Sequence, residues 1–142
     1  MVIKMDEIQA LKEMYKIVAM GIIGIDEAEG KISDKTFEKT LCDARKKYQV
    51  NKVDASKLLD EYGEKPEEIN VITKMFNEIY TNLELLNKDD KKVAKMLIEG
   101  TNKGILKVEE ILNLNLDGKV NDLAKGLLEL LEFQISAWKH YL

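Results

Sequence analysis

Four polar side chains fall at positions where the spacing of apolar residues predicts a buried helix face. Tyr48 and Asn51 share one such stretch, Thr101 lies in a second, and Gln134 lies in a third. A phenol, a hydroxyl and two amides are neutral near pH 7 and can hydrogen-bond one another or a buried water. A buried amide left without a partner would cost roughly 1–3 kcal/mol. We therefore expect a hydrogen-bonded set that fixes helix register, with a small polar ligand pocket as the alternative.

Residues that act as nucleophiles or as soft metal ligands are scarce, since the chain has one cysteine and one histidine. Cys42 follows Leu41 with no predicted base nearby, so we expect an unreactive, half-buried thiol. His140 lies near the end of a predicted helix, where a surface position beside the helix dipole is expected. A lone cysteine cannot form an intrachain disulfide, which suits a reducing cytosol.

The composition predicts a single all-α domain over residues 1–142. Hydrophobic residues make up 45% of the chain and charged residues 34%, with only one proline and eight glycines to interrupt helices. The net charge of −4 and the absence of a basic stripe argue against nucleic-acid binding. The longest apolar run, 17–25, is well short of the roughly 20 residues that span a bilayer, and the start of the chain lacks a signal-peptide pattern. We expect a cytoplasmic protein without membrane contact.

Apolar periodicity predicts five helices, over about residues 4–29, 34–62, 66–86, 89–114 and from 118 to the C-terminus. Gly30 and Gly63 end the first two helices, Ser33 is the expected N-cap of the second, and Pro66 is expected in the first turn of the third. Gly100 and Gly104 form a small face on the fourth. We expect a neighbouring helix to approach it closely, with room for a ligand as the alternative.

An internal repeat relates the first two helices to the last two. Gly104 lies 83 residues after Gly21, and Gln134 lies 83 residues after Asn51, so one offset aligns both helix pairs. Two helical hairpins joined by the segment 66–86 predict a four-helix bundle with an additional crossover helix between the second and third core helices. In that arrangement the helices over 34–62 and 89–114 run parallel.

Four short stretches carry a family resemblance: MGI at 20–22, LLDEYGEKP at 58–66, GTNKGI at 100–105 and EFQISAWK at 132–139. With the predicted topology, they resemble the ferritin-like, rubrerythrin-type superfamily. Such proteins hold two metal ions with a Glu from each of two helices and a Glu-x-x-His from each of the other two. The resemblance places these six ligand positions at Val18, Tyr48, Asn51, Thr101, Leu131 and Gln134.

None of these six residues is a carboxylate or an imidazole, so the resemblance implies a degenerate metal site and no cofactor. Our leading hypothesis is a non-enzymatic bundle that serves protein binding or assembly. One alternative is a metal-binding protein or oxidoreductase with a displaced site, and another is a small-ligand carrier that uses the polar seam. The acids available to a displaced site are Asp26, Asp43, Glu129 and Glu132.

Several apolar residues lie off the predicted core faces. Either the crossover helix covers them or they form a surface for a homodimer or another protein partner; the first is the slightly favoured interpretation. These residues are Met20, Ile23, Leu128 and Ile135.

Overall fold

The architecture is known from a computed structural model that describes residues 2–81, 83–86 and 89–142. Within these ranges every regular element is a helix, which confirms the all-α prediction, and no helix is long and apolar enough to cross a membrane. The α-helices are α1 (Val2–Glu29), α2 (Lys35–Glu61), α3 (Ile69–Ile79), α4 (Asp90–Leu112) and α5 (Gly118–Trp138). Two short 3-10 helices, η1 (Leu83–Leu86) and η2 (Lys139–Tyr141), complete the list.

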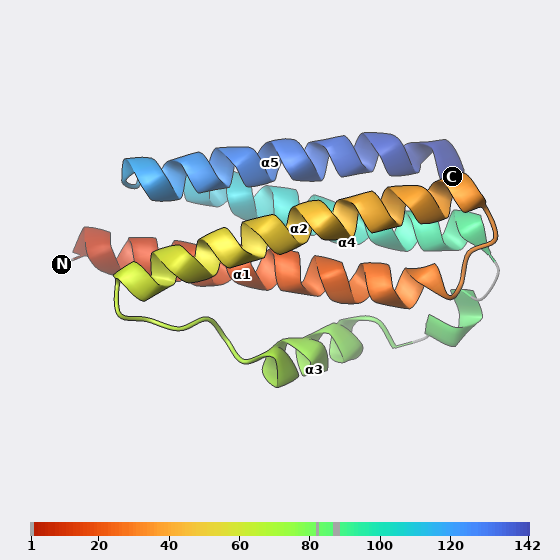
Figure 1. The fold of residues 1–142 in the computed structure, drawn as a ribbon, viewed down its shortest axis with the longest axis horizontal. Coiled ribbons are helices and arrows are strands. Elements are labelled where there is room, and N and C mark those ends of the chain that lie inside the picture. The colour runs from red at the N-terminus through yellow and green to blue at the C-terminus, as the bar shows by residue number, and fades with distance from the viewer. Residues whose placement is uncertain (1, 82, 87–88) are drawn as a thin grey trace.

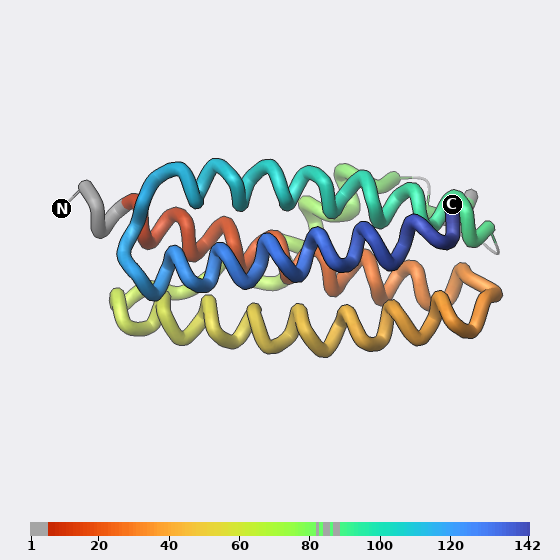
Figure 2. The backbone as a smooth tube through the Cα atoms, turned by 90° about the horizontal axis from the view of Figure 1, so that it is seen from above, coloured from red at the N-terminus to blue at the C-terminus, as the bar shows by residue number. Residues whose placement is uncertain are grey.

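The four long helices lie side by side along a common axis, and α3 lies outside them (Figures 1 and 2). α1 and α2 are antiparallel neighbours, as are α4 and α5. The chain leaves α2 at one end of the bundle and returns past α3, which packs on α1, to start α4 at the other end. α2 and α4 consequently point in the same direction (Figure 1).

The core is built from one buried face per long helix. On α2 the buried residues recur every three or four positions, as an amphipathic helix requires; they are Phe37, Leu41, Ala44, Tyr48, Asn51, Ala55 and Leu59. The strict seven-residue pattern in the sequence predicts Leu58 at the end of this face, yet Leu59 is the buried residue. A straight helix has 3.6 residues per turn and drifts by about 20° per seven residues, which accounts for the one-position shift.

The junction between α1 and α2 is held by two aspartates. Asp34 is the N-cap of α2, and its carboxylate accepts hydrogen bonds from the backbone N–H groups of Thr36 (2.8 Å) and Phe37 (3.1 Å). The prediction of Ser33 as the cap is wrong by one residue. The reason is that the N–H of Ser33 donates to Asp90 at the start of α4 (2.8 Å), and the N–H of Asp34 does the same (3.0 Å).

The predicted helix over 66–86 is only partly correct, because α3 is shorter. Gly63, at φ +72°, ends α2, and residues 64–68 then run without helical structure. Pro66 disfavours helical geometry in the preceding residue, so α3 begins three residues after it rather than one turn around it. α3 ends at Tyr80, where φ is −112° and ψ is 87°, and the Tyr80 ring lies beside Phe76 with centroids 4.7 Å apart.

The end of α5 is fastened to the start of α2. The indole Nε1–H of Trp138 donates to the hydroxyl of Thr40 (3.1 Å), and the Tyr141 hydroxyl donates to that of Thr36 (3.1 Å). The Tyr141 ring also stacks on Phe37 with centroids 4.3 Å apart. These contacts fix α5 along α2 and hold Trp138, which is 1% exposed, in the interior.

Candidate functional site

The six positions singled out from the sequence lie on the inward faces of four different helices. Five of them are buried and Thr101 is half-buried. They are Val18 on α1, Tyr48 and Asn51 on α2, Thr101 on α4, and Leu131 and Gln134 on α5. The interior they share therefore contains neutral side chains from all four core helices.

Tyr48 supplies the largest of these side chains, and it lies against the backbone of α1. A Cβ built on Gly21 would be 2.7 Å from Cε2 of Tyr48, so this ring fits only because residue 21 is glycine. Burial raises the pKa of the Tyr48 phenol, and interaction with the Thr101 side chain opposes this effect only in part. The hydroxyl of Thr101 itself donates to the carbonyl of Leu97 (2.6 Å). Tyr48 is thus a neutral phenol in the centre of the bundle.

The expected hydrogen-bonded polar network is not realised at Asn51. Its Oδ1 atom is buried and accepts no hydrogen bond from any described residue. Gln134, which the 83-residue offset relates to Asn51, is also buried, at 2% exposure. Burial of both amides follows the helical spacing, whereas the satisfaction of each amide depends on side-chain distances that spacing alone does not determine.

The remaining chemically active residues lie on the surface. Cys42 is exposed, which corrects the expectation of a half-buried thiol; one residue beyond the buried Leu41, it is turned about 100° away from the core face. His140 is exposed as well. Across the described ranges, no three His, Cys, Asp or Glu side chains are grouped closely enough to hold a metal ion.

The flanking acids considered for a displaced metal site are all exposed. Asp26 forms an ion pair with Arg45 on α2 (2.8 Å), and Arg45 also binds Glu29 on α1 (2.5 Å). Asp43 pairs with Lys39 one turn earlier (3.5 Å). Two of the four acids therefore already have basic partners on the outside of the α1–α2 hairpin.

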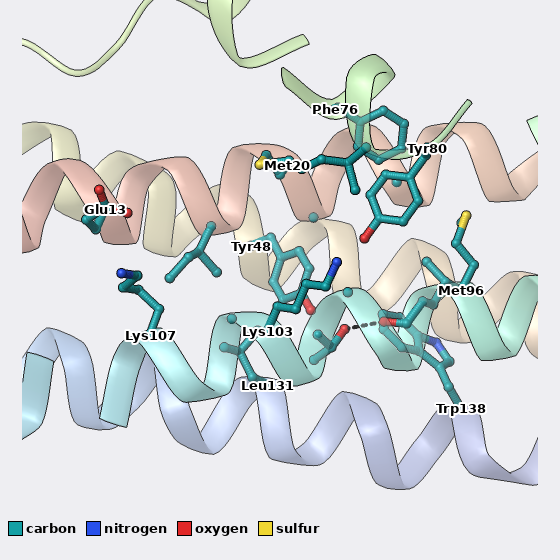
Figure 3. A pocket seen from close by; sticks show the side chains of 18 residues that line it. Glu13, Met20, Tyr48, Phe76, Tyr80, Met96, Lys103, Lys107, Leu131 and Trp138 are labelled. Atoms are coloured by element: carbon teal, nitrogen blue, oxygen red, sulfur yellow. Dashed lines mark hydrogen bonds between the residues drawn. The ribbon is translucent and has the colours of Figure 1, made fainter. Parts of the chain in front are cut away.

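The most prominent feature next to the six positions is a cavity of about 240 Å³ between α1, α3 and α4. Its inner wall is formed by Tyr48, Thr101 and Leu131, which are three of the six positions, together with Trp138. The rings of Phe76 and Tyr80 reach from α3 toward the cavity, and the aromatic ring of Tyr48 faces it from α2 (Figure 3). The cavity thus extends from the α3 side of the bundle to its centre.

Four glycines make this space, two on α1 and two on α4: Gly21, Gly24, Gly100 and Gly104. Glycine inside a helix costs roughly 0.5–1 kcal/mol relative to alanine, so four of them around one cavity form a costly arrangement. Gly24 is not demanded by packing, since a Cβ there would be at ordinary contact distance from Phe76 (3.6 Å) and Leu97 (3.9 Å). Sequence reasoning treated Gly100 and Gly104 mainly as a helix-packing face and did not connect them with the glycines of α1.

The apolar residues off the core faces have different surroundings. Met20 lines the cavity together with α3 residues, and Ile135 is buried within the bundle itself. Ile23 and Leu128 are half-buried. The crossover segment therefore meets part of this apolar surface, at Met20.

Comparison with protein-family models, with curated proteins and with solved structures yields no match to this chain.

Proposed function

We propose that this chain is a non-enzymatic, ferritin-like helical bundle in which a ligand cavity has replaced the di-metal site. The ferritin-like interpretation is supported by two antiparallel helix pairs connected so that α2 and α4 run parallel, with α3 as the outer crossover helix. It is supported also by the burial of five of the six inferred ligand positions.

The observation that carries the proposal is the composition of the cavity's inner wall. Tyr48, Thr101 and Leu131 stand where the resemblance would place metal-binding glutamates, and all three face a cavity of about 240 Å³. An aliphatic cavity of about 150 Å³ already accommodates benzene. The space is large enough for a small, mostly apolar molecule, and this favours ligand binding over the protein-assembly role.

Metal chemistry is disfavoured by the charges of the six side chains. A pair of divalent ions needs several carboxylates, and neutral phenol, hydroxyl, amide and aliphatic groups do not offset the cost of dehydrating the ions. We therefore propose that the chain carries no metal cofactor and no oxidase activity. We also propose a cytoplasmic location, because the exposed thiol of Cys42 suits a reducing compartment.

The proposal can be tested with the fluorescence of Trp138, the single tryptophan of the chain, which lines the cavity. We expect 1-octanol, a neutral probe, to change Trp138 emission saturably and to raise the melting temperature. Gly24→Leu should fill part of the cavity and weaken the response at least tenfold.

Gly126→Leu is the matched control, because a side chain at this exposed position of α5 meets nothing within 4 Å. It introduces the same residue type into a helix and should leave the octanol response unchanged. An octanol response that is absent from the wild type, or equal in Gly24→Leu and the wild type, would contradict the proposal.

A further inference from the structure

The cavity has a charged rim on one side only. Three charged residues line it, namely Glu13 on α1 and Lys103 and Lys107 on α4. Both lysines are exposed and lie one helical turn apart, so their ammonium groups share the same edge of α4. Figure 3 shows Lys103 and Lys107 extending from α4 along the open side of the cavity. The apolar interior is thus bordered by two positive charges and one negative charge.

Two of these three charges already have partners. The Glu13 carboxylate lies 3.6 Å from Lys16 and accepts a hydrogen bond from Gln9 (3.1 Å). Lys107 lies 3.4 Å from Glu110 on the outer side of α4. For Lys103 no carboxylate of the described residues lies within 4.0 Å. The rim therefore offers one uncompensated positive charge beside the apolar space.

The size of the cavity limits the apolar part of its ligand. Scaling from benzene in a cavity of about 150 Å³, a space of about 240 Å³ suits an apolar body of roughly 6–9 carbon atoms. The interior is formed mainly by glycine, aliphatic and aromatic residues, and its polar groups are the hydroxyls of Tyr48, Tyr80 and Thr101. A ligand that extends its apolar end toward Leu131 and Trp138 would leave its other end at the rim.

We propose that the cavity binds a small amphiphilic carboxylate, with its apolar body inside and its carboxylate at Lys103. Lys107 adds a second, weaker attraction, because Glu110 competes for its ammonium group. A monoanion matches the single uncompensated charge, and an ammonium-charged ligand would meet repulsion from both lysines. This inference rests on the proposed ligand-binding function and adds the chemical class of the ligand.

Three eight-carbon probes test the head group while the apolar body stays constant: octanoate, 1-octanol and octylammonium. At low ionic strength and pH 7 we expect octanoate to bind roughly threefold to tenfold more tightly than 1-octanol, with octylammonium weakest. Trp138 emission and isothermal titration calorimetry report the three dissociation constants. Added salt should reduce the difference between octanoate and octanol, because the lysines are exposed.

Lys103→Gln should bring octanoate binding down to the level of 1-octanol and leave octanol binding unchanged. Lys95→Gln is the matched control, since Lys95 is an exposed lysine of α4 that does not line the cavity, and it should change neither constant. Equal affinity for octanoate and octanol, or octanoate binding that survives Lys103→Gln, would overturn the carboxylate assignment while octanol binding still upholds the cavity. Failure of all three probes to bind would overturn the cavity function as well.

Discussion

Tyr48 and Gly21 form the closest contact between an aromatic ring and a helix backbone in the interior, with 2.7 Å between Cε2 and the position of a Cβ at residue 21. A related contact occurs 83 residues later along both helices. There a Cβ on Gly104 would lie 3.4 Å from Cδ1 of Leu131. The same offset thus relates both members of the contact, α1–α2 in one case and α4–α5 in the other, as an internal repeat of a helical hairpin would require.

Gly21→Ala should destabilise the protein by about 1–3 kcal/mol, because the added methyl group would overlap the Tyr48 ring. The measurement is the free energy of unfolding from urea denaturation. Gly126→Ala, at an open helix position, should instead stabilise by up to about 1 kcal/mol. Adding Tyr48→Leu should rescue part of the Gly21→Ala loss, since leucine is the residue that stands at the related position 131. Equal effects of the two alanine substitutions would show that the contact is not tight.

Asn51→Leu should raise the free energy of unfolding by about 1 kcal/mol. The substitution removes a buried amide oxygen that accepts no hydrogen bond from a described residue, and leucine has a similar volume. Thermal and urea denaturation at pH 7 would both report the gain. Asn51→Asp, which puts a charge in the same place, should be strongly destabilising. A loss of stability in Asn51→Leu would mean that the oxygen has a water or ligand partner.

The stability of the protein should fall in acid partly through Asp117, the N-cap of α5. The backbone N–H of Val120 donates to its carboxylate (3.2 Å) and is the main cause that lowers the Asp117 pKa; the Tyr62 hydroxyl, 3.0 Å away, and Glu7 add to it. A lowered folded-state pKa contributes stability that is present above the unfolded value, about 3.9, and is lost as the pH falls through the folded value.

Asp117→Asn should therefore flatten the pH dependence of stability below about pH 4. At pH 7 its cost should be no more than about 0.5–1 kcal/mol, because the carboxylate is exposed and asparagine also caps helices well. Urea denaturation between pH 2.5 and pH 7 measures both effects. A pH profile that is unchanged by the substitution would exclude Asp117 as a source of the acid sensitivity.

Purified protein should contain no stoichiometric iron, manganese or zinc by plasma mass spectrometry. The constructive control restores the inferred ligands, with Glu at positions 18, 48, 101 and 131 and His at 51 and 134. That variant should gain metal affinity and lose several kcal/mol of apo stability, because carboxylates become buried together. About two metal ions per wild-type chain would refute the degenerate-site interpretation, as would a well-folded variant without any gain in metal binding.

Helical periodicity is enough to predict much of this architecture, and local geometry decides the rest. The core faces of α2 and α5 follow from apolar spacing, down to the burial of Asn51 and Gln134. The short length of α3 does not, because Pro66 and the packing of Tyr80 on Gly100 stop a helix that the apolar pattern would continue. The cavity depends on glycines of α1 facing glycines of α4, a relationship that appears only when the helices are placed together.

The central claim is that the interior beside Tyr48 accepts an apolar ligand, and a crystal of the protein soaked with iodobenzene tests it most directly. The anomalous signal of iodine locates the ligand without reference to its effects on stability or fluorescence. We predict an iodine peak within about 4 Å of residues lining the cavity, such as Gly24, Leu97 or Leu131. An iodine site found only on the outer surface, or a cavity occupied by ordered water or a metal ion under these conditions, would contradict the account.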